Sequence, residues 1–286
     1  MAQIATEFTT SRVAGLNVHE TGVQGSPAVV FLHGVGNSGA MWRRHMQLLG
    51  DYHCLAPDLP GFGLSRDLEW VSRSDTGKRV AELIGSKVPA GRAHVVGLSL
   101  GASVAHELLA RRPDLLDRVV IDGCAALPWW GTPLLKAGVA AVSAFLHTSA
   151  VVDAIGRGWG LDEKTKADLR AASRQAFRRG FAHANDVRIS RAEIAATCPT
   201  LLVAGERETY PPVRASNAAL AALMPDATAR FVPGKRHGWI GEEPALHIRM
   251  VEAWLRDDPL PKGLAAESAM WSRARVERLI SRRGDG

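Results

Sequence analysis

The sequence lacks long apolar runs, since no stretch approaches the ~18 consecutive apolar residues that a membrane-spanning helix needs. Its N-terminus, Met1 to Glu7, has neither the basic region nor the apolar core of a secretory signal peptide. Cysteine is scarce: Cys54, Cys124 and Cys198 are widely spaced, odd in number and each in or beside an apolar run. This pattern disfavours a disulfide framework or a zinc site. These absences predict a cytoplasmic protein with buried free thiols and no bound metal.

The sequence also lacks a strong excess of positive or negative charge. Its 35 Lys and Arg against 29 Asp and Glu leave a net charge of only +6. The densest basic stretch, residues 170–191, is interleaved with only two aromatic residues, Phe177 and Phe181, and matches no nucleic-acid-reading motif. We therefore expect a solvated helical face there and no nucleic-acid partner. The 286 residues, 46% of them hydrophobic, are enough to bury a large core.

Short apolar runs that alternate with helical patterns indicate the fold. The runs that predict buried strands are residues 28–33, 52–56, 94–97, 118–122, 200–205 and 229–232. Strands that alternate with helices imply right-handed crossovers and a mostly parallel sheet flanked by helices. Residues 125–197 break this rhythm, since they are helical, alanine-rich and punctuated by Pro, Gly and Trp. We predict an α/β core from 1–124 and 198–257, with 125–197 inserted as a helical cap.

The last 29 residues, 258–286, are predicted to be a linker followed by a basic amphipathic helix from Leu264 to Arg282. Such a helix can pack on its own domain, form a homodimer contact or lie on a membrane surface. We regard it as a candidate homodimer element, because packing against protein is the commoner role of such a helix.

The centre of the sequence is Gly97-Leu98-Ser99-Leu100-Gly101, where a β-branched run passes directly into a helix. A serine at such a turn adopts a strained backbone, and its neighbours must lack bulk, which Gly97 and Gly101 provide. The hydroxyl of Ser99 would then stand exposed above the end of the sheet, beside the free N–H groups of the next helix. The alternative is a glycine-rich turn whose serine caps a helix.

A second glycine-rich segment, Gly34-Val35-Gly36-Asn37-Ser38-Gly39, matches the G-x-G-x-x-G pattern of dinucleotide-binding loops, and Asp58 follows at the expected distance. However, His33 directly precedes the first glycine, and Asp58 runs into the tight loop Leu59 to Gly63. We favour a loop whose glycines aim a backbone N–H into an active site, with His33 bracing it.

A nucleophilic serine needs a base and an acid that orients the base. His237 is the preferred base, because it lies in the loop after the last predicted strand, at the same sheet edge as Ser99. Glu208, three residues after Gly205, is the preferred acid. Glu206 comes second, and Asp122, at the end of the strand after the serine's helix, is the topological alternative.

These motifs resemble those of serine hydrolases of the α/β-hydrolase superfamily, in the order nucleophile, acid, histidine. The resemblance covers residues 6–255. The motifs on which it rests are His33 to Gly36, Asp58 to Gly63, the Ser99 motif, Gly205 to Glu208 and His237. It implies that Ser99 is the nucleophile, His237 the base and Glu208 the acid, with the N–H groups of Val35 and Leu100 as the oxyanion hole. Most members carry aspartate at the position of Glu208, which keeps Asp122 open as the acid. No cofactor is implied.

The resemblance implies an acyl-enzyme mechanism on a small-molecule substrate, and we favour carboxylic esters of small to medium apolar acids. The expected pocket residues are aromatic: Trp42, Trp129, Trp130, Phe145, Trp159 and Trp239. One alternative is a carbon–carbon bond hydrolase for ring-cleavage dienones, which would need a cap arginine such as Arg157, Arg188 or Arg191 to hold a substrate carboxylate. Others are a cofactor-free haloperoxidase-like enzyme and a ligand-binding receptor on the same fold.

Overall fold

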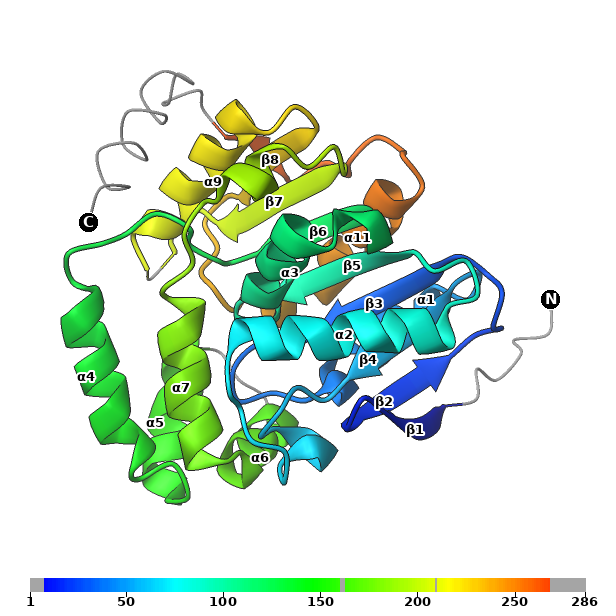
Figure 1. Cartoon of the computed structure of the whole chain (residues 1–286). Helices are drawn as coiled ribbons and strands as arrows, with labels where there is room; N and C mark the ends of the chain where they lie inside the picture. The colour runs from blue at the N-terminus through cyan, green and yellow to red at the C-terminus, as the bar shows by residue number, and fades with distance from the viewer. Residues whose placement is uncertain (1–7, 160–162, 209, 268–286) are drawn as a thin grey trace.

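The computed structural model describes residues 8–159, 163–208 and 210–267, which include a nine-stranded sheet in the order β1-β2-β4-β3-β5-β6-β7-β8-β9 (Figure 1). The strands are β1 (Thr9–Val13), β2 (Leu16–Thr21), β3 (Ala28–Leu32), β4 (His53–Pro57), β5 (Ala93–Leu98), β6 (Leu116–Asp122), β7 (Thr200–Gly205), β8 (Ala227–Val232) and β9 (Ala265–Ala266). From β4 through β8 the neighbours are parallel, whereas β1, β2 and β9 pair antiparallel. The predicted α/β-hydrolase fold, with its mostly parallel sheet, is confirmed.

Helices cover both faces of this sheet (Figure 1). One face packs against α2 (Arg73–Lys87), α3 (Leu100–Arg111) and α9 (Pro212–Leu223), and the other against α1 (Arg43–Leu48) and α11 (Pro244–Leu255). Because both faces are covered, β3, β4 and β7 are buried at every position, as their predominantly apolar sequences predict. None of the described helices is long and apolar enough to cross a membrane.

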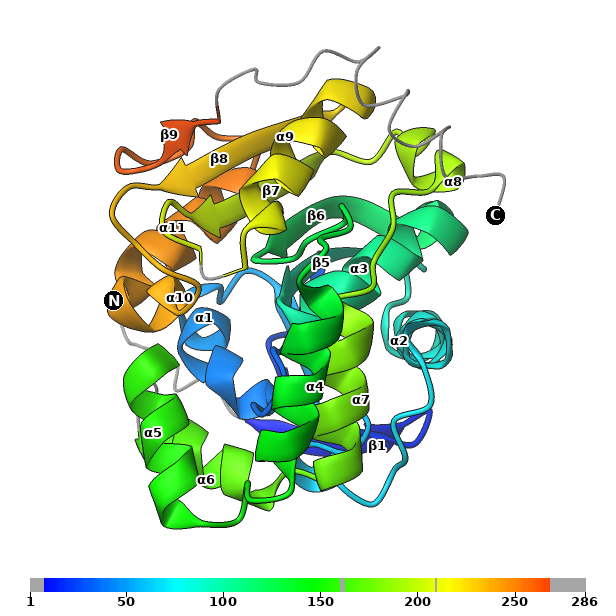
Figure 2. The ribbon, with the colours of Figure 1, turned by 90° about the vertical axis from the view of Figure 1, so that its left-hand side faces the viewer.

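Helices α4 to α8 lie between β6 and β7, and we call this segment the helical insertion. It contains α4 (Thr132–Ser143), α5 (Ser149–Trp159), α6 (Glu163–Ala171), α7 (Arg174–Ala184) and α8 (Arg191–Ile194). Figures 1 and 2 show α4 on the outside, with α7 between it and the core. The helical character predicted for 125–197 is therefore observed, while the division into a core and a cap domain at those residues stays a prediction.

The segment after the core differs from its prediction. Residues predicted to begin a helix at Leu264 are extended, and β9 pairs with β8 at the edge of the sheet. Glu267 is tied to α9 by an ion pair of 2.7 Å with Arg214. Alanine favours helix, but pairing with β8 satisfies backbone groups at an otherwise open sheet edge. The rest of the predicted helix, and with it the predicted homodimer contact, lies outside the described residues.

Candidate active site

Ser99 occupies a strained turn between β5 and α3, with φ 52° and ψ −105°. Its N–H donates to the Asp122 carbonyl at 2.8 Å, so the turn is tied to the neighbouring strand β6. A Cβ at Gly97 would lie 2.6 Å from the Gly101 carbonyl oxygen, and one at Gly101 would lie 2.1 Å from the Leu32 oxygen. Both glycines are therefore required for the close approach of strand and helix, as their spacing predicts.

The loops after β7 and β8 bring Glu208 and His237 together. The distance between His237 Nδ1 and Glu208 Oε2 is 3.0 Å, and Glu208 Oε1 accepts a hydrogen bond from the Gly205 N–H at 3.3 Å. The Glu208 side chain is only 3% exposed, so these contacts fix its orientation. The His237 ring packs on Gly123, where a Cβ would lie 2.7 Å from the ring carbon Cε1. The ring therefore lies beside the end of β6, the strand to which Ser99 is also hydrogen-bonded.

Electrostatics determine what the His237 ring can do. Burial by itself lowers the pKa of His237, but the charge of Glu208 and its hydrogen bond raise the pKa above the ordinary value of 6.5. With a proton on Nδ1 donated to Glu208, the neutral ring presents Nε2 as an acceptor. His237 is therefore arranged as a proton acceptor that Glu208 stabilises once it is charged.

Asp122, the alternative acid, belongs to a different polar network. It is fully buried at the end of β6, where Oδ1 accepts from Trp239 Nε1 at 3.2 Å and Oδ2 lies 3.5 Å from His247 Nε2. His247 in turn contacts His45 through a hydrogen bond of 2.7 Å. Burial, reinforced by the charge of Glu208, raises the pKa of Asp122 to about 8. Asp122 is therefore an uncharged hydrogen-bonding acid at neutral pH, and Glu208 is the carboxylate that contacts His237.

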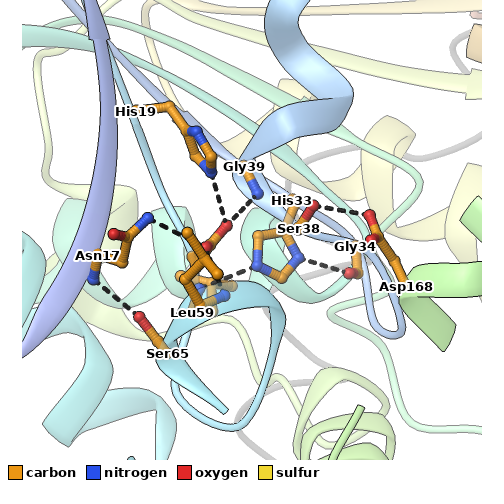
Figure 3. A network of polar contacts seen from close by, with 11 residues as sticks. Asn17, His19, His33, Gly34, Ser38, Gly39, Leu59, Ser65 and Asp168 are labelled. Carbon is orange, nitrogen blue, oxygen red and sulfur yellow. Dashed lines mark hydrogen bonds and ion pairs between the residues drawn. The ribbon is translucent and has the colours of Figure 1, made fainter. Parts of the chain in front are cut away.

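The loop after β3 is held by a network of polar contacts, and Figure 3 shows His33, Gly34, Ser38 and Gly39 of this loop within it. The Asp58 carboxylate accepts hydrogen bonds from the N–H groups of Gly39 at 2.7 Å and Leu64 at 2.8 Å. His33 braces the same loop, since Nδ1 contacts the Gly34 carbonyl at 2.8 Å and Nε2 accepts from the Leu59 N–H at 2.9 Å. Asp58 is fully buried, so it is not available to bind a ribose as the dinucleotide-loop pattern would require.

This bracing places two backbone N–H groups near Ser99. A Cβ at Gly34 would lie 3.6 Å from the Ser99 Cβ, which shows how close the loop comes to the strained turn. Within the described residues, neither the N–H of Val35 nor that of Leu100 has a hydrogen-bond acceptor. Free N–H groups on both sides of a serine are the arrangement that binds a negatively charged oxygen.

A cavity of about 370 Å³ opens at this point, and Ser99, His237 and Val35 line it. Its other walls are mostly apolar and come from the core and from the helical insertion: Met41, Leu98, Leu135, Phe181, Val213 and Ile240. Four polar side chains, Asn37, Thr165, Asn185 and Tyr210, complete it, and no Lys or Arg is among the lining residues, all of which lie in the described part of the chain. No periodic signal in the sequence marks these residues, because they come from eight separate segments of the chain.

Of the six aromatic residues expected in the pocket, the five whose side chains the structure describes do not line this cavity. Trp42 and Trp239 are fully buried in the core on the α11 side of the sheet. Trp129 packs edge-on against Tyr210, with ring centroids 5.4 Å apart, so it supports a lining residue from behind. Trp130 and Phe145 are exposed to solvent, and the side chain of Trp159 lies outside the described residues. Aromatic character predicted burial or stacking, but it did not predict which way each ring points.

In the part of the chain that the structure describes, neither a metal site nor a carboxylate-binding arginine accompanies the cavity. Among the residues that the structure describes, no three His, Cys, Asp or Glu side chains gather as a potential metal site. Arg157, Arg188 and Arg191, proposed from the sequence as carboxylate ligands, are not among the lining residues. The cavity therefore suits an uncharged group better than an anionic one.

Comparison with known proteins gives consistent matches. A family model described as "Alpha/beta hydrolase family" matches residues 29–280. An AB hydrolase superfamily protein of Gibberella zeae is 30% identical over 254 residues, which cover 84% of this chain and 83% of that protein. A haloalkane dehalogenase of Bradyrhizobium diazoefficiens is 37% identical over 113 residues, or 39% of this chain and 36% of that protein. The structure of an enol-lactonase from Burkholderia xenovorans LB400 shares the fold, with a TM-score of 0.72 at 19% identity over 87% of this chain and 100% of that one.

Proposed function

The chain belongs to the α/β-hydrolase family, and we propose that it is a serine hydrolase that cleaves carboxylic esters of small to medium apolar acids. The observation that carries this proposal is the His237–Glu208 contact of 3.0 Å beside the strained Ser99, with Ser99 and His237 lining one cavity. A strained nucleophile, a polarised histidine and a buried carboxylate together form the apparatus of acyl transfer.

In the proposed reaction the ester carbonyl binds with its carbon next to Ser99 Oγ. His237 Nε2 takes the hydroxyl proton as Oγ forms a bond to the carbonyl carbon, and Glu208 stabilises the resulting imidazolium. The tetrahedral oxygen, now negatively charged, accepts hydrogen bonds from the Val35 and Leu100 N–H groups, each worth about 3 kcal/mol in the transition state. Collapse expels the alcohol, which receives the proton from His237. Water, deprotonated by the same nitrogen, then releases the acid and restores Ser99.

The cavity supports the substrate class. Its volume of about 370 Å³ is at the lower end for small-molecule sites, which fits a small or medium acyl group. The walls offer apolar contacts, and the amides of Asn37 and Asn185 can meet a neutral polar group without requiring a charge on the substrate. A ring-cleavage dienone with a free carboxylate would enter without a cationic partner, which makes the carbon–carbon hydrolase alternative less favourable.

The test is hydrolysis of p-nitrophenyl esters from acetate to octanoate by the wild-type protein and by Ser99→Ala. We expect wild-type turnover with an optimum at short or medium chains, and a loss of about 10⁴-fold or more in Ser99→Ala, because the nucleophile is removed. In parallel, a fluorophosphonate should add one phosphonyl group to Ser99, located by peptide mass spectrometry. Full activity in Ser99→Ala would refute the proposal. Thermal stabilisation by ester analogues without turnover would favour the receptor alternative.

A further inference from the structure

Helix α4 presents large apolar side chains to solvent. Around this helix Trp130 is 87% exposed, Leu134 77%, Phe145 59% and Val142 40%. We call these four residues the α4 stripe. Leu134 and Val142 lie eight residues apart on α4, about 12 Å along its axis at 1.5 Å per residue, while Trp130 precedes the helix and Phe145 follows it. Figures 1 and 2 place α4 at the outer surface of the molecule.

The stripe is not the expected face of an amphipathic helix. The inner side of α4 is already apolar, since Leu135 lines the cavity and Val139 packs on the main core cluster. The outer side should then carry several charges, yet the one Lys, Arg, Asp or Glu between 128 and 150, all of which the structure describes, is the partly exposed Lys136, which pairs with Asp186 at 3.6 Å. Elsewhere the large exposed apolar residues, Val23, Leu48, Leu64 and Val71, are separated in sequence and lie on different elements. A continuous exposed apolar face indicates an interaction surface.

Basic side chains lie on the helix that flanks α4. Figure 2 shows this helix, α7, beside α4. Among its exposed residues are Arg174 and Arg178, neither of which forms an ion pair with the described part of the chain. Residues 125–197 contain ten Lys and Arg against six Asp and Glu, so this part of the chain is basic. A second copy that docked the same face would bring positive charge against positive charge. The partner that complements both the apolar stripe and its basic flank is an anionic lipid surface.

We propose that the α4 stripe binds the surface of anionic lipid bilayers. Trp130 and Phe145, at the two ends of α4, enter the headgroup region, where amphipathic and aromatic rings are favourable. Leu134 and Val142 bury apolar area between them, and the arginines of α7 add electrostatic attraction to lipid phosphates. Docking in this way places the helix that walls the cavity, through Leu135, directly against the lipid.

The test is co-sedimentation of the full chain with vesicles of phosphatidylcholine alone or mixed with phosphatidylglycerol. We expect binding to the anionic vesicles that weakens with salt, and at least a tenfold loss of affinity in Leu134→Gln/Val142→Gln. The matched control is Leu48→Gln/Leu64→Gln, two exposed leucines at 58% each, which should bind as the wild type does. Arg174→Ala/Arg178→Ala should weaken binding to anionic vesicles and reduce its salt dependence.

Several outcomes would overturn this proposal: no binding to anionic vesicles, equal loss in the control variant, or concentration-dependent dimerisation that Leu134→Gln/Val142→Gln abolishes. Hydrolysis of a short soluble ester should be the same in all these variants, because none of them lines the cavity. The vesicle assay therefore reports on the surface alone and fails or succeeds independently of the esterase proposal.

Discussion

The core and the helical insertion differ in where they place most of their charged groups. Near the cavity the core buries Asp58 and Glu208 and gives each of them several partners. In the insertion most ion pairs lie near the surface, for example Lys166 with Glu163 and Asp153, and the exception is Glu193, which α8 buries against His106 of the core helix α3. Burial in the core fixes the orientation of these side chains at a cost in desolvation free energy. The insertion instead forms an outer surface of the molecule and one wall of the cavity.

This difference matches what each part contributes to the cavity. The core supplies Ser99, His237 and Val35, whose proposed roles depend on positions within a few tenths of an ångström. The insertion supplies Leu135, Phe181 and the rest of its wall, which have only to fit an acyl group. We infer that substitutions in the core change the rate of the reaction and those in the insertion change which substrate enters.

The largest effect on activity should come from a comparison of substitutions at the two buried acids, Glu208 and Asp122. Glu208→Ala should lower kcat by about 10³- to 10⁴-fold, since the charged histidine loses its partner. Asp122→Asn should change kcat less than tenfold, because an amide replaces a carboxyl group that is already uncharged at neutral pH and still accepts from Trp239. Ester hydrolysis by the two variants measures both. The reverse result would make Asp122 the acid of the site.

A second large effect concerns stability of the core. Asp58→Ala should lower the free energy of unfolding by about 3 to 5 kcal/mol, because it removes a fully buried carboxylate and leaves the buried N–H of Gly39, and also that of Leu64, without an acceptor. Asp51→Ala is the control: this carboxylate, 84% exposed, pairs with Arg256 at the surface and should matter by less than about 1 kcal/mol. Urea unfolding compares them, and equal midpoints would show that the Asp58 network is dispensable.

The change of kcat/KM with pH should be an effect of intermediate size. His237 must be neutral to accept a proton, and its pKa lies above 6.5, so kcat/KM should fall as the pH drops through that raised value, by about tenfold per unit. In Glu208→Gln the negative charge is gone, and the fall should move to lower pH. A profile recorded on free enzyme with a short ester tests this. An unchanged midpoint in the variant would show that Glu208 does not set the pKa of His237.

The smallest effect on stability and activity is expected from substitutions at the contact between the core and the insertion. The Ser38 hydroxyl donates to Asp168 Oδ2 on α6 at 2.7 Å and so links the loop after β3 to the insertion (Figure 3). Ser38→Ala should cost about 1 kcal/mol of stability and alter KM less than threefold. A double-mutant cycle with Asp168→Ala isolates the contact, and additive losses would mean that the two groups do not interact.

Sequence alone determined the order of the elements and the position of the strained turn at Ser99. Apolar runs of strand length and the Gly97 and Gly101 spacing are local patterns, and the structure reproduces them within a few residues at most strands and at Ser99. The loop after β8 was predicted to lie at the serine's edge of the sheet, because parallel strands end at the same edge. Local periodicity is enough for these features.

Only the tertiary structure decided which side chains meet. Asp122 and Glu208 both follow strands that end at the same edge, but Asp122 shares a sheet face with Val120, toward α11, while Glu208 turns to His237. The outward direction of Trp130 and Phe145, and the pairing of β9 with β8, likewise depend on neighbours far away in the sequence. Residue type and spacing set the period of an element, but packing against distant elements sets its rotation and its partners, and those fix the cavity.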